Sequence, residues 1–137
     1  MNENSDQQRL LNTLPELTTR FPAIEVLYLF GSRAKGAAGS DSDVDVAVFL
    51  EAKALRDNPL LDLEIGAFLE KKLSCPVDVL VMQKASPITQ HQVLAGGVRL
   101  FEREPAYRAR VELISFKRYQ DARHYQKKRQ EAFRRRF

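Results

Sequence analysis

The segment from residue 26 to residue 50 constrains the fold of this chain more than any other part. Its sequence is VLYLFGSRAKGAAGSDSDVDVAVFL, in which two apolar runs, residues 26–30 and 44–50, flank a connection rich in Gly, Ala, Ser and Asp. Short apolar runs of β-branched and aromatic composition predict strands, because such side chains pack well on a pleated surface. We therefore expect two strands joined by a polar connection that opens with Gly31-Ser32.

Two carboxylates, Asp43 and Asp45, lie at the start of the second predicted strand. Residues two apart in a strand share one face, so these side chains project side by side while Val44 and Val46 point into the core. Adjacent carboxylates repel each other unless a cation lies between them, and Mg²⁺ prefers hard oxygen ligands together with substrate phosphates. The pair therefore predicts a magnesium site at one end of the sheet.

The Gly31-Ser32 pair predicts a phosphate-binding turn. Gly31 lets the backbone approach a ligand closely, and Ser32 can cap a helical turn that we expect to follow it. Free N–H groups at a helix N-terminus attract anions, and Arg33 or Lys35 can add positive charge. A lone Gly-Ser is usually an ordinary turn and a lone Asp-x-Asp a solvated strand end. Their conjunction at a fixed spacing between two strands favours a functional site.

A third carboxylate, Asp78, interrupts the valine-rich run of residues 76–82. This run predicts a strand with its valines on one face and Asp78 on the other. Because an unpaired carboxylate is costly to bury, two interpretations remain. Asp78 is either a further ligand of the predicted metal site or a surface residue on an edge strand.

The remaining chain predicts an α/β sandwich, a mixed sheet with flanking helices and a long C-terminal helix. The first helical pattern has an apolar stripe of leucines at positions 10, 14 and 17. It contains Pro15 and fits one kinked helix or two short ones, and Ser86-Pro87 and Gly96-Gly97 predict the start and end of a later helix. We expect helices at about residues 6–20, 59–73 (with Asn58 as its N-cap), 86–95 and 106–133, a strand at 98–102 and a polar loop at 51–57.

Length and composition fit one globular domain. The chain has 137 residues, of which 44% are hydrophobic and 29% charged. No signal peptide is visible, and no apolar run approaches the ~18 residues that span a bilayer. The single cysteine, Cys75, excludes an internal disulfide and fits a reducing cytoplasm. We therefore expect a cytoplasmic protein, and we expect no zinc site because the two histidines are far apart in the sequence.

The stretch GSRAKGAAGSDSDVDVAVFL resembles the signature of the DNA polymerase β-like nucleotidyltransferases, and more narrowly that of their minimal, MNT-type members. The matching positions are Gly31-Ser32, Ala34, Gly36 and Ser42 to Asp45, and the resemblance covers roughly residues 7–103. It implies the polymerase β-like nucleotidyltransferase fold. It also implies that residues 1–103 form the minimal catalytic domain, with the basic helix of residues 104–137 as part of the same domain.

The resemblance further implies transfer of a nucleotidyl group from a triphosphate, with ATP as substrate, to an acceptor hydroxyl. In that family Mg²⁺ is the cofactor, and Asp43 and Asp45 would hold two ions. Asp78 would join them on the ion that activates the acceptor. The implied nucleotide-binding residues are Gly31, Ser32, Arg33 and Ser42.

MNT-type proteins pair with HEPN-domain toxins, which are RNases. The resemblance thus implies an antitoxin that transfers AMP from ATP to a tyrosine of its toxin partner. Two alternatives remain open, a non-catalytic antitoxin that neutralises the toxin by binding, and an enzyme acting on a small molecule or an RNA end. The intact Gly-Ser and three carboxylates favour the first hypothesis, and the lack of a second acceptor-binding domain counts against the last.

The C-terminal segment carries the positive charge of the chain. Residues 1–102 contain 10 Lys/Arg and 14 Asp/Glu, a net of −4, whereas residues 103–137 contain 12 and 4, a net of +8. A basic helix of this kind is often a solvated end, and it can also bind RNA phosphates or an acidic face of the toxin partner. We favour docking, since Phe133 and Phe137 interleave with the arginines.

Overall fold

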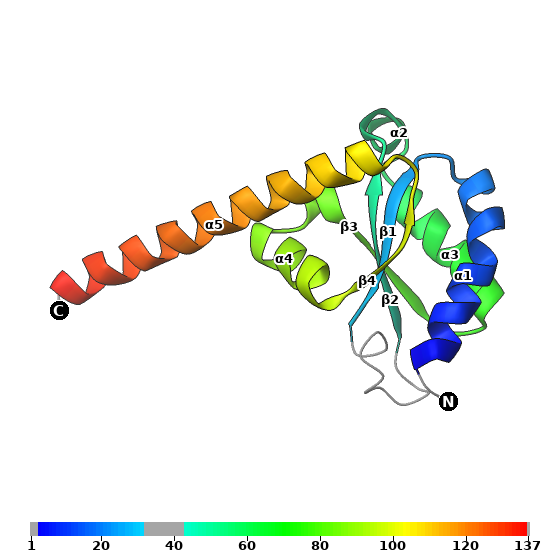
Figure 1. Ribbon diagram of the computed structural model, residues 1–137, viewed down its shortest axis with the longest axis horizontal. Helices are drawn as coiled ribbons and strands as arrows, with labels where there is room; N and C mark the ends of the chain where they lie inside the picture. Colours follow the sequence, from blue (N-terminus) through cyan, green and yellow to red (C-terminus); the bar gives the residue numbers. More distant parts are fainter. Residues whose placement is uncertain (1–2, 32–42, 137) are drawn as a thin grey trace.

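The computed structural model describes residues 3–31 and 43–136, which form a four-stranded sheet with helices on both faces (Figure 1). The alternation of strands and helices produces the α/β architecture that the sequence predicts. In chain order the elements are α1 (Glu3–Arg20), β1 (Ile24–Phe30), β2 (Val44–Leu50), α2 (Ala52–Asp57), α3 (Leu61–Leu73), β3 (Val77–Val81), the 3₁₀ turn η1 (Met82–Lys84), α4 (Pro87–Gly96), β4 (Val98–Glu102) and α5 (Pro105–Arg136).

The sheet is mixed, as expected, with the strand order β3-β2-β1-β4. Strand β1 runs antiparallel to both β2 and β4, whereas β2 and β3 are parallel. Parallel neighbours need a crossover connection, and α2 and α3 provide it between β2 and β3. As a result, β3 lies at an edge of the sheet and begins beside the start of β2.

Side-chain alternation along the strands divides the core into two clusters. On one face, Leu27 and Val46 pack with side chains of α1 and α3 such as Leu17 and Leu69. On the other face, Tyr28 and its neighbours pack against α4 and α5; this cluster contains Val26, Tyr28, Ala47, Phe49, Met82 and Val93, with Tyr107 and Val111 of α5 beside it. Figure 1 shows α1 and α3 on one side of the sheet and α4 and α5 on the other.

The first helical pattern forms a single helix, α1, with Pro15 inside it. Its expected apolar stripe is buried, with Leu10 and Leu17 fully enclosed. The predicted loop at 51–57 is wrong, because residues 52–57 form α2. Ala, Lys, Leu and Arg are strong helix formers, and Ala54 and Leu55 rest against the core, which stabilises this short helix. The predicted start of the next helix at Pro59 is also wrong, because α3 begins at Leu61 and Asn58 instead accepts a hydrogen bond from the backbone N–H of Leu60 in the preceding turn.

The ends of α4 show one confirmed and one wrong expectation. Ser86 caps the helix by accepting a hydrogen bond from the backbone N–H of Thr89 (3.1 Å). Gly97 does not adopt the left-handed conformation of a glycine stop, since its φ is −93°. It is needed for space instead, because a Cβ there would lie 2.6 Å from the carbonyl oxygen of Val93 and 3.0 Å from that of Leu29.

Helix α5 spans 32 residues, and its C-terminal part extends beyond the rest of the molecule (Figure 1). Among the described residues, no helix combines the length and apolar character required to cross a membrane.

Candidate active site

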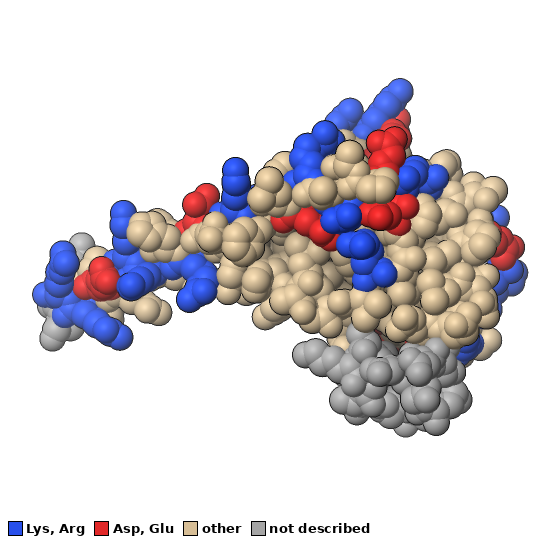
Figure 2. All heavy atoms as spheres, in the orientation of Figure 1, with Lys and Arg blue, Asp and Glu red and all other residues tan. Residues whose placement is uncertain are grey.

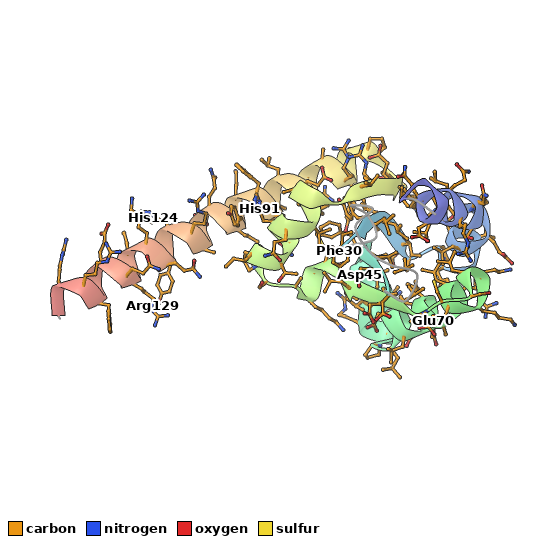
Figure 3. The ribbon with its side chains drawn as sticks, turned by 90° about the horizontal axis from the view of Figure 1, so that it is seen from below. Phe30, Asp45, Glu70, His91, His124 and Arg129 are labelled. Atoms are coloured by element: carbon orange, nitrogen blue, oxygen red, sulfur yellow. The ribbon has the colours of Figure 1, made fainter. Side chains whose placement is uncertain are left out.

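The candidate site lies where β1 ends and where β2 and β3 begin. Phe30, the last residue of β1, pairs with Asp45 of β2, and Asp45 pairs in turn with Asp78 of β3. Because paired residues on adjacent strands point to the same face, Asp45 and Asp78 stand side by side. Figure 3 looks toward this end of the sheet and shows Asp45 close to Phe30, with Glu70 on the neighbouring helix α3.

Asp45 and Asp78 share the sheet face that packs against α4 and α5. Val44 and Val46 point into the cluster with α1 and α3, whereas Ala47 belongs to the opposite cluster. Asp45 has the parity of Ala47 and therefore projects toward the α4 and α5 side, and Asp43, just before β2, lies near both Asp45 and Asp78. The expectation that Val44 and Val46 point into the core while Asp45 points the other way is confirmed.

Asp45 is partly buried, and its pKa is raised, first by desolvation and then by the nearby carboxylates of Asp78 and Asp43. Asp78 is exposed on the edge strand, which is the position that the surface-residue interpretation predicts. Nevertheless, desolvation raises its pKa, and the charge of Asp43, a hydrogen bond with the Asp43 side chain and the charge of Glu70 raise it further. The three aspartates thus repel one another, which a bound cation would relieve.

Gly31, the residue that follows β1, lies close to Asp45. Its φ is +81°, a left-handed conformation that favours glycine. A Cβ at this position would lie 2.3 Å from Oδ2 of Asp45. Gly31 therefore lies close to an acid of the site, and its positive φ favours glycine at this position.

The donor chemistry of the three aspartates fits Mg²⁺, because all their ligand atoms are hard carboxylate oxygens. Within residues 3–31 and 43–136, no three His, Cys, Asp or Glu side chains are already arranged as a metal-binding cluster. The aspartates therefore suit Mg²⁺ by the type of their ligand atoms and by the strand register that brings Asp45 and Asp78 together, but they do not already form a complete coordination site.

The remaining predicted site residues, Ser32, Arg33 and Ser42, lie outside the described residues, as does Lys35. One acidic neighbour was not predicted. Glu70 accepts a hydrogen bond from the backbone N–H of Val77 (3.1 Å) at the start of β3, and it lines a groove of about 310 Å³ with Asp78 between α3 and β3. No local sequence signal marks Glu70, since its role depends on how α3 packs beside β3.

Comparison with known proteins identifies the class to which this fold and site belong. The chain belongs to the family described as Polymerase beta, Nucleotidyltransferase, which matches residues 12–106. The predicted family and the polymerase β-like nucleotidyltransferase fold are therefore confirmed.

Among curated relatives, two proteins named Protein adenylyltransferase MntA are similar to this chain. The protein from Shewanella oneidensis is 33% identical over 101 residues, which cover 74% of this chain and 66% of the relative. The protein from Aphanizomenon flos-aquae is 32% identical over 93 residues, which cover 63% of this chain and 62% of the relative. The matched part of the chain thus spans slightly less than two thirds of each relative.

Solved structures of toxin–antitoxin complexes contain chains of similar fold. A chain in a toxin–antitoxin structure with AMP-PNP superposes with a TM-score of 0.69 at 27% identity, covering 90% of this chain and 94% of that chain. A chain in the complex of a tri-AMPylated Shewanella oneidensis HEPN toxin with an MNT antitoxin gives 0.64 at 27% identity, covering 93% and 95%.

Proposed function

We propose that this chain is an antitoxin that transfers AMP from ATP to a tyrosine hydroxyl of a HEPN toxin and thereby neutralises it. The observation that carries the proposal is the register of Asp45 against Asp78, which brings acids from two strands together beside the Gly31 turn. The relatives named protein adenylyltransferase and the structure containing an AMPylated HEPN toxin support the same activity.

The proposed role of the three acids is to hold Mg²⁺ and to position the acceptor. Bound Mg²⁺ ions, two in this family's chemistry, neutralise phosphate charge and lower the pKa of a coordinated hydroxyl. Asp43 and Asp45 would hold them from β2, and Asp78 would add a ligand from β3. Asp78 lies on the edge strand β3 and is exposed, whereas Asp45 on the inner strand β2 is partly buried. Asp78 is therefore the strand carboxylate best placed to meet an arriving acceptor.

The proposed nucleotide-binding residues are Gly31, Ser32, Arg33 and Ser42. At Gly31 the backbone comes close to Asp45, so triphosphate oxygens bound at this turn would lie beside the acids. Backbone N–H groups and the Ser32 hydroxyl would donate to those oxygens, and Arg33 would balance their charge.

The proposed reaction forms one P–O bond and breaks another. The tyrosine oxygen attacks the α-phosphorus of ATP while the bond between that phosphorus and the oxygen bridging to the β-phosphate breaks, which releases diphosphate. The tyrosine proton leaves toward the Asp78 carboxylate. Catalysis consists chiefly of positioning and charge stabilisation, which a small domain can provide.

The experiment is incubation of the full chain with the HEPN protein, ATP and Mg²⁺, followed by intact-mass spectrometry. The proposal predicts a mass increase of one or more AMP groups on the HEPN protein and none with the Asp43→Asn/Asp45→Asn variant. Neutralisation without any mass increase would contradict it and support an antitoxin that acts by binding. Parallel reactions with an RNA oligonucleotide in place of the HEPN protein test the alternative acceptor.

A further inference from the structure

Helix α5 has two parts with different surroundings. In the inner part, Ser115 is buried and donates a hydrogen bond to Oε1 of Gln90 on α4 (2.8 Å). Tyr119 stacks on His91 of α4 with ring centroids 3.6 Å apart and an interplanar angle of 4°. Beyond this contact, every residue from 123 to 135 is exposed. We call residues 123–135 the α5 arm, and it reaches about 20 Å at the ~1.5 Å rise per residue of a helix.

The α5 arm is strongly basic. It contains six Lys/Arg residues and a single acid, Glu131. Figure 2 shows Lys and Arg side chains gathered along the protruding end of the molecule. Charge of one sign on an exposed helix repels itself and favours a partner of the opposite sign. The basic residues are Arg123, Lys127, Lys128, Arg129, Arg134 and Arg135.

Aromatic residues of the arm continue the packing face of the inner helix. Eighteen residues make five turns of about 3.6 residues each, so positions 18 apart point the same way. Tyr125 thus repeats the direction of Tyr107, which packs against the core, and Phe133 repeats that of the buried Ser115. Yet Tyr125 is 63% exposed and Phe133 is 64% exposed. The face that holds α5 on the body therefore extends along the arm, where the described residues of the body do not cover it.

The charges of the arm surround this aromatic face unevenly. Lys128 and Arg135 lie beside the face, next to the direction of Tyr125, whereas Arg123, Lys127 and Arg134 lie on the side of the helix away from Tyr125. Within the face, the guanidinium of Arg129 lies over the ring of Tyr125, 5.9 Å from its centroid. Aromatic and arginine side chains within a charged rim are the arrangement typical of protein interfaces, and the Tyr–Arg combination is common among residues that dominate binding energy.

We propose that the α5 arm is the docking element for the acceptor protein and that it binds an acidic surface with an apolar groove at its centre. That the docked protein is also the acceptor of AMP rests on the proposed function. The docking of a partner on the arm does not depend on that function. The opposite charges would speed association and make it sensitive to salt, and Tyr125 with its neighbours would provide the apolar contact. The arm would thus bind the partner at a distance from the aspartates and present it to them.

The test compares two charge-reversal variants of the full chain that change the net charge equally. The arm variant is Lys127→Glu/Lys128→Glu/Arg129→Glu, and the control on the exposed surface of the body is Lys53→Glu/Arg56→Glu/Lys84→Glu. At low salt the arm variant should weaken the affinity for the HEPN protein about tenfold, with a smaller change at high salt. In transfer assays the arm variant should raise KM and leave kcat unchanged, because the aspartates are untouched.

A second pair of variants tests the aromatic face. Tyr125→Ala should weaken binding, whereas Leu113→Ala, an exposed apolar residue (55%) on the opposite side of α5, should not. Circular dichroism of each variant verifies that the helix content is retained. Equal affinities for the arm variant and its control would overturn the proposal, even if AMP transfer were intact.

The same variants distinguish two other possible ligands of the arm, RNA and a second copy of the chain. Loss of affinity for a single-stranded RNA oligonucleotide, with unchanged HEPN binding, would identify the arm as an RNA site and overturn the proposal. Loss of self-association alone, measured by analytical ultracentrifugation, would do the same in favour of a second copy of the chain. If the wild-type protein binds the HEPN protein through the arm but modifies nothing, the proposed function fails and the docking proposal stands.

Discussion

The two faces of the sheet are built for different purposes from the same strands. The face toward α1 and α3 is covered by one apolar cluster that includes Leu27, Val46 and Ile65. The face toward α4 and α5 carries polar groups as well, such as the partly buried hydrogen bond from the Tyr28 hydroxyl to Glu112 (2.8 Å) and the acids at the sheet end. Strand alternation thus places a purely apolar cluster on one side and the proposed catalytic acids beside a second apolar cluster on the other, so that changes to the first side need not damage the proposed chemistry.

The largest expected effect is on the chemical side. The Asp43→Asn/Asp45→Asn variant should reduce AMP transfer by about 10³-fold or more, on the order of 4 kcal/mol, because it removes the proposed metal ligands. Its metal-free stability should be equal to or slightly above that of the wild type, since the carboxylates repel one another. Transfer rates and urea unfolding in EDTA measure the two quantities. Undiminished transfer would remove the acid pair from the mechanism.

A smaller loss is expected from Asp78, the acid on the edge strand. Asp78→Ala should lower kcat by about 10²-fold, the lower end of general-base contributions, while the affinity for ATP changes little. The reason is that Asp78 is proposed to act on the acceptor and not on the triphosphate. Single-turnover rates and ATP titration separate these effects, and an unchanged kcat would make Asp78 an ordinary surface residue of β3.

On the apolar side, Leu27→Ala should act on stability alone. Leu27 is fully buried, so truncation should cost about 2–5 kcal/mol in the free energy of unfolding. The activity per folded molecule should remain that of the wild type, because Leu27 points away from the acids. Urea titrations and active-site-normalised rates would test this, and a specific loss of kcat would show that the two faces are not independent.

The smallest effect concerns the ion pair between β4 and α5. A hydrogen bond from Arg108 (2.8 Å) lowers the pKa of Glu102 below its ordinary value of 4.5. A lowered folded-state pKa gives stability that is complete above pH 4.5 and is lost as the pH falls through the folded value. The stability difference between wild type and Glu102→Gln should therefore shrink between pH 6 and pH 3, and a constant difference would contradict this origin.

Local sequence patterns predicted much of the fold. The two apolar runs correctly predicted strands β1 and β2, and the helical spacing of leucines correctly predicted the buried face of α1. Both predictions succeed because they depend only on the pattern of residues within one segment. The cap at Ser86 was also predictable from neighbouring residues. By contrast, the predicted loop at 51–57 overlooked α2, whose two partly buried residues gain stability only from the assembled core.

The site was predictable in its residue types but not in its geometry. Asp78 could be proposed as a third acid from the valine-rich run, but its pairing with Asp45 follows from the parallel packing of β3 on β2. The same long-range packing explains Glu70, which binds the start of β3. The spatial need for Gly97 likewise depends on the approach of β1 to the end of α4, which no local pattern reveals.

The most direct test of the central claim follows the two ends of ATP separately. Parallel reactions with the HEPN protein and Mg²⁺ would contain ATP labelled at either the α-phosphate or the γ-phosphate. We predict that the α-label becomes attached to a tyrosine of the HEPN protein while the γ-label leaves as diphosphate, and that neither is transferred by the Asp43→Asn/Asp45→Asn variant. Transfer of the γ-label to the protein, or equal α-labelling by the variant, would contradict nucleotidyl transfer at this site.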